Sequence, residues 1–126
     1  MVEFSSRKLD DVVLAVPVGQ IDHPNAQQLQ QALTPILDDP SAGKTALVLD
    51  FAGVTYVSSM GLRVLMVAAK QMRSRSARMA VAALQPVVAE IFDIARFRHV
   101  VEVFPSVRDA LQALSAPALE AYDASR

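Results

Sequence analysis

The sequence predicts a single α/β domain with a mainly parallel central sheet, an N-terminal β-hairpin and about four helices. Strand-like apolar runs alternate with amphipathic helix-like segments, and such alternation needs crossover connections that make neighbouring strands parallel. The chain has 126 residues, a length typical of one domain with one core. Apolar residues make up 52% and charged residues 20%, which is ordinary globular usage and argues against disorder.

The first two predicted strands form the hairpin. Residues 2–9 alternate weakly between apolar and polar, Asp10-Asp11 is a turn signal, and residues 12–18 form a stronger apolar run. Pro17 has no N–H to donate to a neighbouring strand, so we expect an edge, a bulge or an end of pairing near it.

The rest of the chain alternates between helix and strand patterns. Pro35 predicts a kink or an early end of the first helix. A turn-like segment over 52–56 separates a buried strand from the helix that starts near Ser59. The pattern fades after 115, so we expect a domain over 1–115 and a flexible tail over 116–126. In chain order the predicted elements are a helix over 25–37, a strand over 46–51, a helix from 59 to between 73 and 76, a strand over 78–84, a helix from 86, a strand over 99–104 and a helix from 106 to 114.

Composition excludes several classes of function. The formal net charge is −1 and no dense Lys/Arg run appears, so the electrostatic footprint of a nucleic-acid binder is missing. No apolar stretch is long enough to span a membrane, and no signal-peptide pattern opens the sequence. The chain has no cysteine, and its only histidines are His23 and His99, which excludes disulfides, cysteine-ligated zinc and a His-rich metal site. We expect a cytoplasmic protein that binds no metal or cofactor, contacts no nucleic acid directly and does not insert into membranes.

One short segment, Val57-Ser58-Ser59-Met60-Gly61-Leu62, marks the change from strand to helix periodicity. Ser58 or Ser59 is a good candidate for the helix N-cap, at the positive end of the helix dipole, where a negative group is tolerated best. Gly61 leaves the backbone bare for a close approach. From these residues alone, a capping role for Ser59 is the more frequent case, and a functional hydroxyl is the alternative.

The element order and this segment together resemble the STAS family, which comprises anti-sigma factor antagonists and the cytoplasmic domains of sulfate transporters. The resemblance covers roughly residues 5 to 115. It is carried by Gly19, Asp22, Asn25-Ala26, Val48-Leu49-Asp50-Phe51, Val57-Ser58-Ser59-Met60-Gly61-Leu62, Leu84 and Phe92.

The resemblance implies a phosphorylation switch. Antagonists of this family carry Asp-Ser-Ser/Thr-Gly-Leu, whose first serine is phosphorylated by a partner anti-sigma serine kinase. Alignment on Gly61-Leu62 puts Ser59 at the phosphoacceptor, Ser58 where the aspartate usually stands, and Met60 at the second hydroxyl position. The unmodified protein would bind the kinase, phosphorylation would release it, and a serine phosphatase would reset the switch. The implied partner-binding residues are Asp22, His23, Asn25, Ser58, Ser59, Met60 and Arg63.

Two other functions stay open at this point. The same fold could serve as a non-switching adaptor or structural subunit of a transporter or signalling complex, with Ser59 acting only as a cap. An enzyme or small-ligand binder could use Asp50 and the helix start at Ser59 for an anion, although Asp50 could equally cap a turn. The sequence contains none of the common nucleotide-binding, nucleophile-elbow or zinc-protease motifs, so we expect a binding module and not an enzyme.

Overall fold

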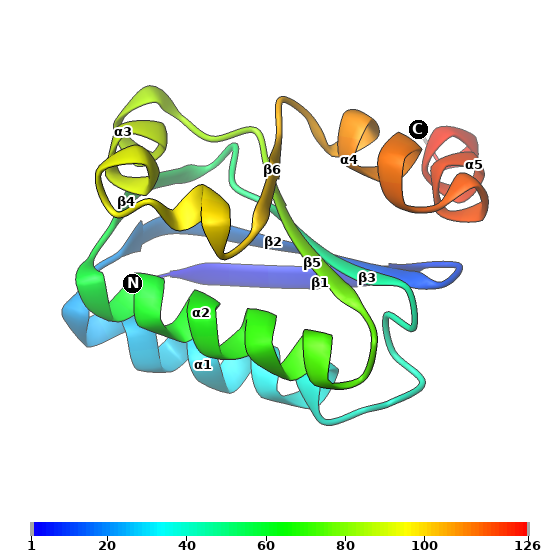
Figure 1. Ribbon diagram of the computed structural model, residues 1–126, viewed down its shortest axis with the longest axis horizontal. Coiled ribbons are helices and arrows are strands. Elements are labelled where there is room, and N and C mark those ends of the chain that lie inside the picture. Colours follow the sequence, from blue (N-terminus) through cyan, green and yellow to red (C-terminus); the bar gives the residue numbers. More distant parts are fainter. Residues whose placement is uncertain (1, 126) are drawn as a thin grey trace.

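The chain follows the order β1-β2-α1-β3-β4-α2-β5-α3-β6-α4-α5 in the computed structural model, which describes residues 2–125 (Figure 1). A 3₁₀ helix, η1, lies between α3 and β6. This is the single α/β domain that the sequence predicts. The elements are β1 Glu3–Leu9, β2 Val12–Ile21, α1 His23–Leu37, β3 Ala46–Asp50, β4 Val54–Val57, α2 Ser59–Ser74, β5 Arg78–Ala82, α3 Pro86–Ile94, η1 Phe97–His99, β6 Glu102–Phe104, α4 Val107–Leu114 and α5 Ala116–Ala124.

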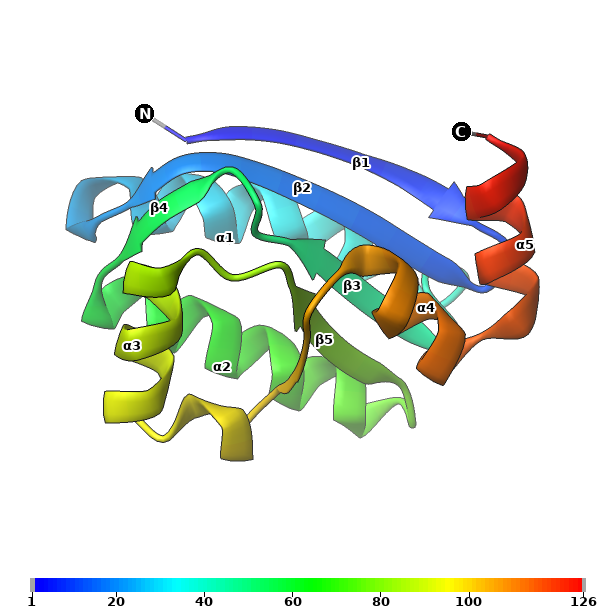
Figure 2. The same cartoon turned by 90° about the horizontal axis from the view of Figure 1, so that it is seen from above.

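The sheet is mixed, in the strand order β1-β2-β3-β5-β6, with β4 paired to β2. Among the strands of the described residues, 2–125, only β1 runs antiparallel to its neighbour, which confirms the N-terminal hairpin on an otherwise parallel sheet. Strand β2 changes partner along its length: residues 12–15 pair with β3, and residues 19–21 pair with β4 (Figure 2). Pro17 lies between these two ladders, at the place where pairing was expected to stop.

Helices cover both faces of the sheet. Helices α1 and α2 lie side by side against one face, and α4 and α5 cover part of the other (Figure 1). The larger core cluster lies under α1, α2 and α3 and includes Leu29, Leu65 and Phe92. The smaller cluster lies under α4 and α5 and includes Val48 and Leu111. Burial on both faces explains why β3 is an uninterrupted apolar run.

Three local predictions need correction. The segment predicted as a turn over 52–56 contains strand β4, because the far half of β2 offers it a parallel partner. The last strand starts at Glu102 and not at 99, since residues 97–99 form η1. Helix α1 continues past Pro35 to Leu37, so the proline does not end it early. Among residues 2–125, no helix is long and apolar enough to cross a membrane.

The C-terminal segment is a helix, where the sequence predicts a flexible tail over 116–126. Helix α5 covers Ala116–Ala124, and Arg126 lies outside the described residues. Ser115 caps the helix by accepting a hydrogen bond from the N–H of Ala118 at 3.2 Å. Ala118 is fully buried. The sequence pattern misses this helix because Ala118, its one fully buried residue, is small, and its other core contacts, Leu119, Ala121 and Tyr122, are only partly buried, which weakens the periodic signal.

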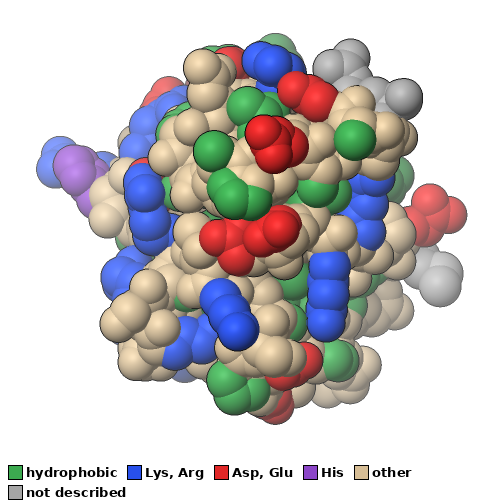
Figure 3. Space-filling view, turned by 90° about the vertical axis from the view of Figure 1, so that its right-hand side faces the viewer, with side chains coloured by type: hydrophobic (Ala, Val, Ile, Leu, Met, Phe, Trp, Pro, Cys, Tyr) green, Lys and Arg blue, Asp and Glu red, His purple; other side chains and the backbone are tan. Residues whose placement is uncertain are grey.

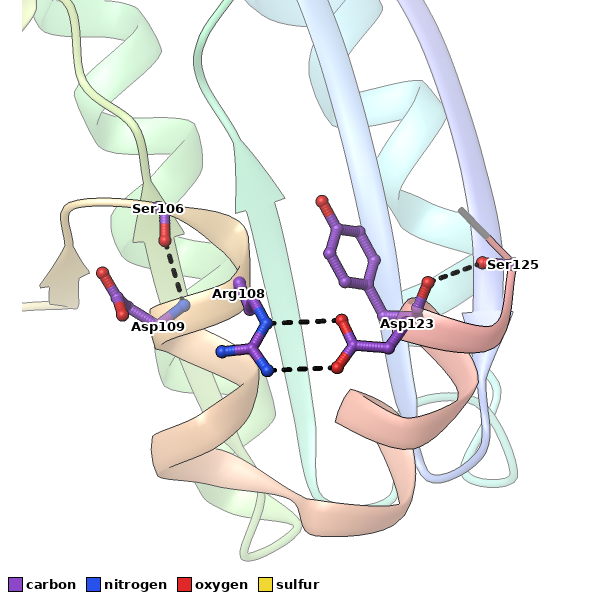
Figure 4. Close-up of polar contacts among 6 residues, drawn as sticks. Ser106, Arg108, Asp109, Asp123 and Ser125 are labelled. Atoms are coloured by element: carbon purple, nitrogen blue, oxygen red, sulfur yellow. Dashed lines mark hydrogen bonds and ion pairs between the residues drawn. The ribbon is translucent and has the colours of Figure 1, made fainter.

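Side chains tie α5 to its neighbours. Arg7 of β1 lies 5.6 Å from the ring centroid of Tyr122 and donates a hydrogen bond to Ser125 Oγ at 3.0 Å. Arg108 of α4 forms a two-bond ion pair with Asp123 of α5 (Figure 4). This end of the molecule mixes acidic and basic side chains (Figure 3). Exposed pairs of this kind contribute little each, about 0–1 kcal/mol, so they orient α5 more than they stabilise it.

Asp11, in the turn of the hairpin, joins three parts of the fold. Its carboxylate accepts hydrogen bonds from the hydroxyls of Ser115 and Thr45. Burial raises the pKa of Asp11, but the hydrogen bonds from Ser115 and Thr45 outweigh it, so that the net pKa lies below its ordinary value. The ionised carboxylate therefore links the hairpin to the start of β3 and to the junction of α4 and α5.

Acid should weaken the fold through this group. A carboxylate whose pKa is lowered by folding stabilises the protein above its unfolded pKa of about 4, and this contribution is lost as the pH falls through the lower folded pKa. We expect Asp11→Asn to have a lower free energy of unfolding than the unsubstituted protein at neutral pH. Below a pH of about 4 the difference should shrink. Urea unfolding of both proteins across this range is the measurement, and a difference that does not vary with pH would contradict the assignment.

Candidate functional site

Two helices begin side by side at one end of the molecule, on the left in Figure 1. Strands β2 and β4 run parallel, and Ile21 is paired with Val57. Helix α1 then starts at His23 and α2 at Ser59. The N–H of Ser58 donates a hydrogen bond to the carbonyl of Ile21 at 2.8 Å, which fixes one helix start against the other.

The two serines have different roles. Ser58 is the N-cap of α2, since its hydroxyl oxygen accepts a hydrogen bond from the N–H of Gly61 at 3.1 Å. Ser59 is the first helical residue, and its side chain is exposed. Its hydroxyl makes no hydrogen bond to any of residues 2–125, and it belongs to the positive end of the α2 dipole. The structure therefore assigns the capping role to Ser58 and leaves the hydroxyl of Ser59 accessible.

Gly61 allows α2 to begin so close to β2 and β4. A Cβ atom at this position would lie 2.8 Å from Cγ2 of Ile21 and 2.9 Å from Cγ1 of Val57. It would also lie 3.1 Å from the carbonyl oxygen of Ile21, a backbone atom that cannot rotate away. The glycine at the helix start is thus required by packing, as its place in the sequence motif suggests.

Gly61→Ala should therefore destabilise the protein, although alanine is the better helix former by about 1 kcal/mol. Overpacking a close-packed site costs about 1–3 kcal/mol, so after the gain in helix propensity we expect a net loss of up to about 2 kcal/mol in the free energy of unfolding. Urea unfolding measures it, with Met60→Ala on the exposed side of the same turn as the control. A higher free energy of unfolding for Gly61→Ala would show that the structure can accommodate a Cβ atom at this position.

The start of α1 contributes three of the predicted residues: Asp22 just before the helix, and His23 and Asn25 in its first turn. Asp22 caps α1, its Oδ1 accepting a hydrogen bond from the N–H of Asn25 at 3.1 Å. The side chain of Asn25 is only 8% exposed, and its Nδ2 donates to the carbonyl of Gln20 at 3.1 Å. The amide of Asn25, in the first turn of α1, thus holds the end of β2 against the helix start, and its contact with a partner stays a prediction. His23 is exposed and Asp22 is half-buried.

Met60 and Arg63 lie at one end of a groove between α1 and α2 that the sequence does not predict. The groove has a volume of about 150 Å³. Met60 is 39% exposed, and Val67, two turns further along α2, is 47% exposed. A valine on the outward side of an amphipathic helix is the one signal that could have indicated it. The lining residues are Gln30, Leu33, Thr34, Leu37, Met60, Arg63, Val64, Val67, Ala68 and Gln71.

The other ends of α1 and α2 are tied together by Arg75, which follows α2. Its guanidinium donates hydrogen bonds to the carbonyls of Leu37, Asp39 and Ala42, at 3.3, 2.7 and 2.6 Å. Gln71 adds a hydrogen bond to the carbonyl of Leu37 at 3.1 Å. These bonds satisfy carbonyls at the carboxyl end of α1 and in the loop that follows, where a helix lacks partners of its own.

Asp50, the residue proposed for an anion-binding or catalytic alternative, caps a turn. Its Oδ1 accepts a hydrogen bond from the N–H of Ala52 at 3.0 Å. This geometry matches the structural alternative for Asp50.

Comparison with known proteins defines the class. The STAS domain model matches residues 3–110, and the chain belongs to the STAS family. Its relatives place it with anti-sigma factor antagonists, proteins that typically act by binding and not by catalysis. The chain is 35% identical over 118 residues to BtrV of Bordetella bronchiseptica, which is described as a candidate anti-sigma factor antagonist. That match covers 94% of this chain and 98% of BtrV.

Two solved structures share the fold. An anti-sigma factor antagonist candidate from Thermotoga maritima superposes with a TM-score of 0.80 at 18% identity, covering 88% of this chain and 93% of that one. The phosphorylated form of SpoIIAA, a cell-fate determinant of Bacillus, superposes with a TM-score of 0.67 at 12% identity, covering 88% of this chain and 98% of that one. At these identities the likeness establishes the fold, with its strand–helix order.

Proposed function

We propose that this protein is an anti-sigma factor antagonist that captures an anti-sigma serine kinase while Ser59 is unmodified. The observation that carries the proposal is the hydroxyl of Ser59, which is exposed, makes no hydrogen bond to residues 2–125 and lies at the start of α2 next to the start of α1. A fold relative, SpoIIAA, exists in a phosphorylated form, which supports a switch of the same kind here.

The switch consists of one phosphoryl transfer. The kinase moves the γ-phosphoryl group of ATP to Oγ of Ser59, the hydroxyl proton passes to a base of the kinase, and ADP leaves. The phosphate adds a charge of about −1.5 to −2 at pH 7. A helix N-terminus tolerates this charge, so the fold stays intact and the effect falls on the partner. A partner surface that docks on the neutral hydroxyl would have to desolvate the phosphate dianion after modification. This cost dissociates the complex.

The proposed contact surface surrounds Ser59. Asn25, in the first turn of α1, supports this surface from beneath through its hydrogen bond to the carbonyl of Gln20. A serine phosphatase would hydrolyse the phosphate and restore binding. The surface comprises Asp22, His23, Ser58, Ser59, Met60 and Arg63.

The test is the intact mass of the protein purified from its native cells, with any phosphate mapped to a residue. We expect a fraction with one added phosphate on Ser59, and none in a strain that carries Ser59→Ala. An absence of phosphate under several growth and stress conditions would refute the switch. It would favour the non-switching adaptor or structural subunit that other STAS domains exemplify.

A further inference from the structure

Arg63 lies one turn after Ser59 on the same face of α2. Residues four apart on a helix are neighbours, with Cβ atoms about 5–6 Å apart. Helical side chains lean toward the N-terminus, so the long side chain of Arg63 can reach the position of Ser59. Arg63 is exposed and forms no ion pair with any of residues 2–125. A phosphate on Ser59 would thus have a free guanidinium within reach, and arginine binds phosphate by two parallel hydrogen bonds.

The same arginine lines the groove between α1 and α2. Its neighbours in the groove are the exposed apolar side chains of Met60 and Val67, with Gln30 and Thr34 on the wall formed by α1. Among the described residues that line the groove, Arg63 is the one with a charge, and none is acidic. From Met60 to Gln71 the α2 wall is about 16 Å long, or three helical turns.

These features define the chemistry of an occupant. An apolar floor with a polar rim fits the apolar side of a short amphipathic helix, whose anchors recur every three to four residues. The single positive charge at the Ser59 end fits a carboxylate on that helix and disfavours a basic segment. The groove is continuous with the surface around Ser59, since Met60 and Arg63 belong to both.

We infer that the groove receives an acidic amphipathic helix of the partner, held at one end by Arg63, and that a phosphate on Ser59 withdraws Arg63 from it. Phosphorylation then removes the cation that the partner's carboxylate needs and places a dianion beside it. This inference rests on the proposed function, because it concerns how the same serine controls its partner.

The first test needs no partner. Phosphoserine is installed at position 59 during expression, and its second pKa is measured by ³¹P NMR titration. A nearby guanidinium favours the dianion, so we expect a phosphate pKa lower by about 0.5 unit than in the Arg63→Gln protein. Arg73→Gln, near the far end of α2, is the matched control and should resemble the unsubstituted protein. Equal pKa values with and without Arg63 would overturn the inference.

The second test uses a designed probe for the groove. The probe is a 12-residue amphipathic helical peptide of leucine, alanine and glutamate, compared with its glutamine analogue by amide NMR shifts at up to millimolar concentration. We expect shifts at the groove residues and at least about threefold tighter binding of the glutamate peptide. This preference should vanish in Arg63→Gln and in the phosphorylated protein. Val67→Ser should weaken both peptides, whereas Val87→Ser, at a valine outside the groove that is 55% exposed, should change neither.

The results that would overturn this inference differ from those that would refute the proposed function. No shift at the groove, or equal affinity for the two peptides, would overturn the inference. Groove shifts that depend on protein concentration without peptide would identify a second copy as the occupant and would also overturn it. Because the phosphoserine is installed during expression, a failure to find phosphate in native cells would refute the proposed function while leaving the Arg63 tests valid.

Discussion

Ser59→Asp should bind the proposed partner, an anti-sigma serine kinase, more than a hundredfold more weakly than Ser59→Ala, and Ser59→Ala should bind as tightly as the unmodified protein. The hydroxyl of Ser59 forms no bond within residues 2–125, so its loss costs the fold nothing. An added carboxylate must be desolvated at the interface, and a loss of about 3 kcal/mol corresponds to more than a hundredfold in affinity. Titration calorimetry with the purified kinase measures both values. Equal affinities would refute the switch.

Ser58→Asp is the matched control for this experiment. It adds the same charge one residue earlier and restores the aspartate that antagonists of the family usually carry. An aspartate at this position can still cap α2, accepting from the N–H of Gly61 as Ser58 does. We expect Ser58→Asp to keep its affinity and its unfolding free energy. A loss equal to that of Ser59→Asp would show that the partner avoids any negative charge at this helix start and not a charge on Ser59 in particular.

Phe92→Ala should lower the free energy of unfolding by about 3–5 kcal/mol, as expected when a buried aromatic ring is removed. Phe92 is fully buried in α3. Its ring packs edge-on against Phe51 at 6.2 Å between centroids and against Phe97 at 5.0 Å. It therefore holds α3 to the end of β3 and to η1. Urea unfolding is the measurement.

The control for Phe92 lies two residues further along α3. Ile94 is 77% exposed, so Ile94→Ala should change the unfolding free energy by no more than about 0.5 kcal/mol. If Phe92→Ala lost less than about 1 kcal/mol, the cluster of three rings would be too loosely packed to hold α3 in place.

Long elements with a strong period were predictable from the sequence, and elements that depend on distant partners were not. The apolar run at 46–50 and the helical spacing after Ser59 both carry their own signal. Strand β4 has four residues, and its middle pair, Thr55 and Tyr56, faces solvent. Only the extension of β2 past Pro17 gives it a partner, and that pairing is not encoded in the local sequence.

The candidate site was predictable to the level of a segment and not of each side chain. Sequence reasoning places a hydroxyl at the helix start but does not distinguish Ser58 from Ser59 as the cap, because that depends on which residue has extended backbone angles. Asn25 has the polarity of a surface residue, yet the carbonyl of Gln20 draws its amide inward. Val67 becomes part of a groove only because α1 lies next to it.

Arg75 limits how far the two helices that form the groove can move relative to each other. Its hydrogen bonds, with those of Gln71, hold the carboxyl ends of α1 and α2 together. At the opposite end, Gly61 packs closely against Ile21. Fastened at both ends, the two walls have little freedom to slide or spread. Adaptation to a partner is left to the flexible side chains of Met60 and Arg63. The groove is thus preformed, and a partner segment bound there would avoid the entropic cost of ordering the backbone of this protein.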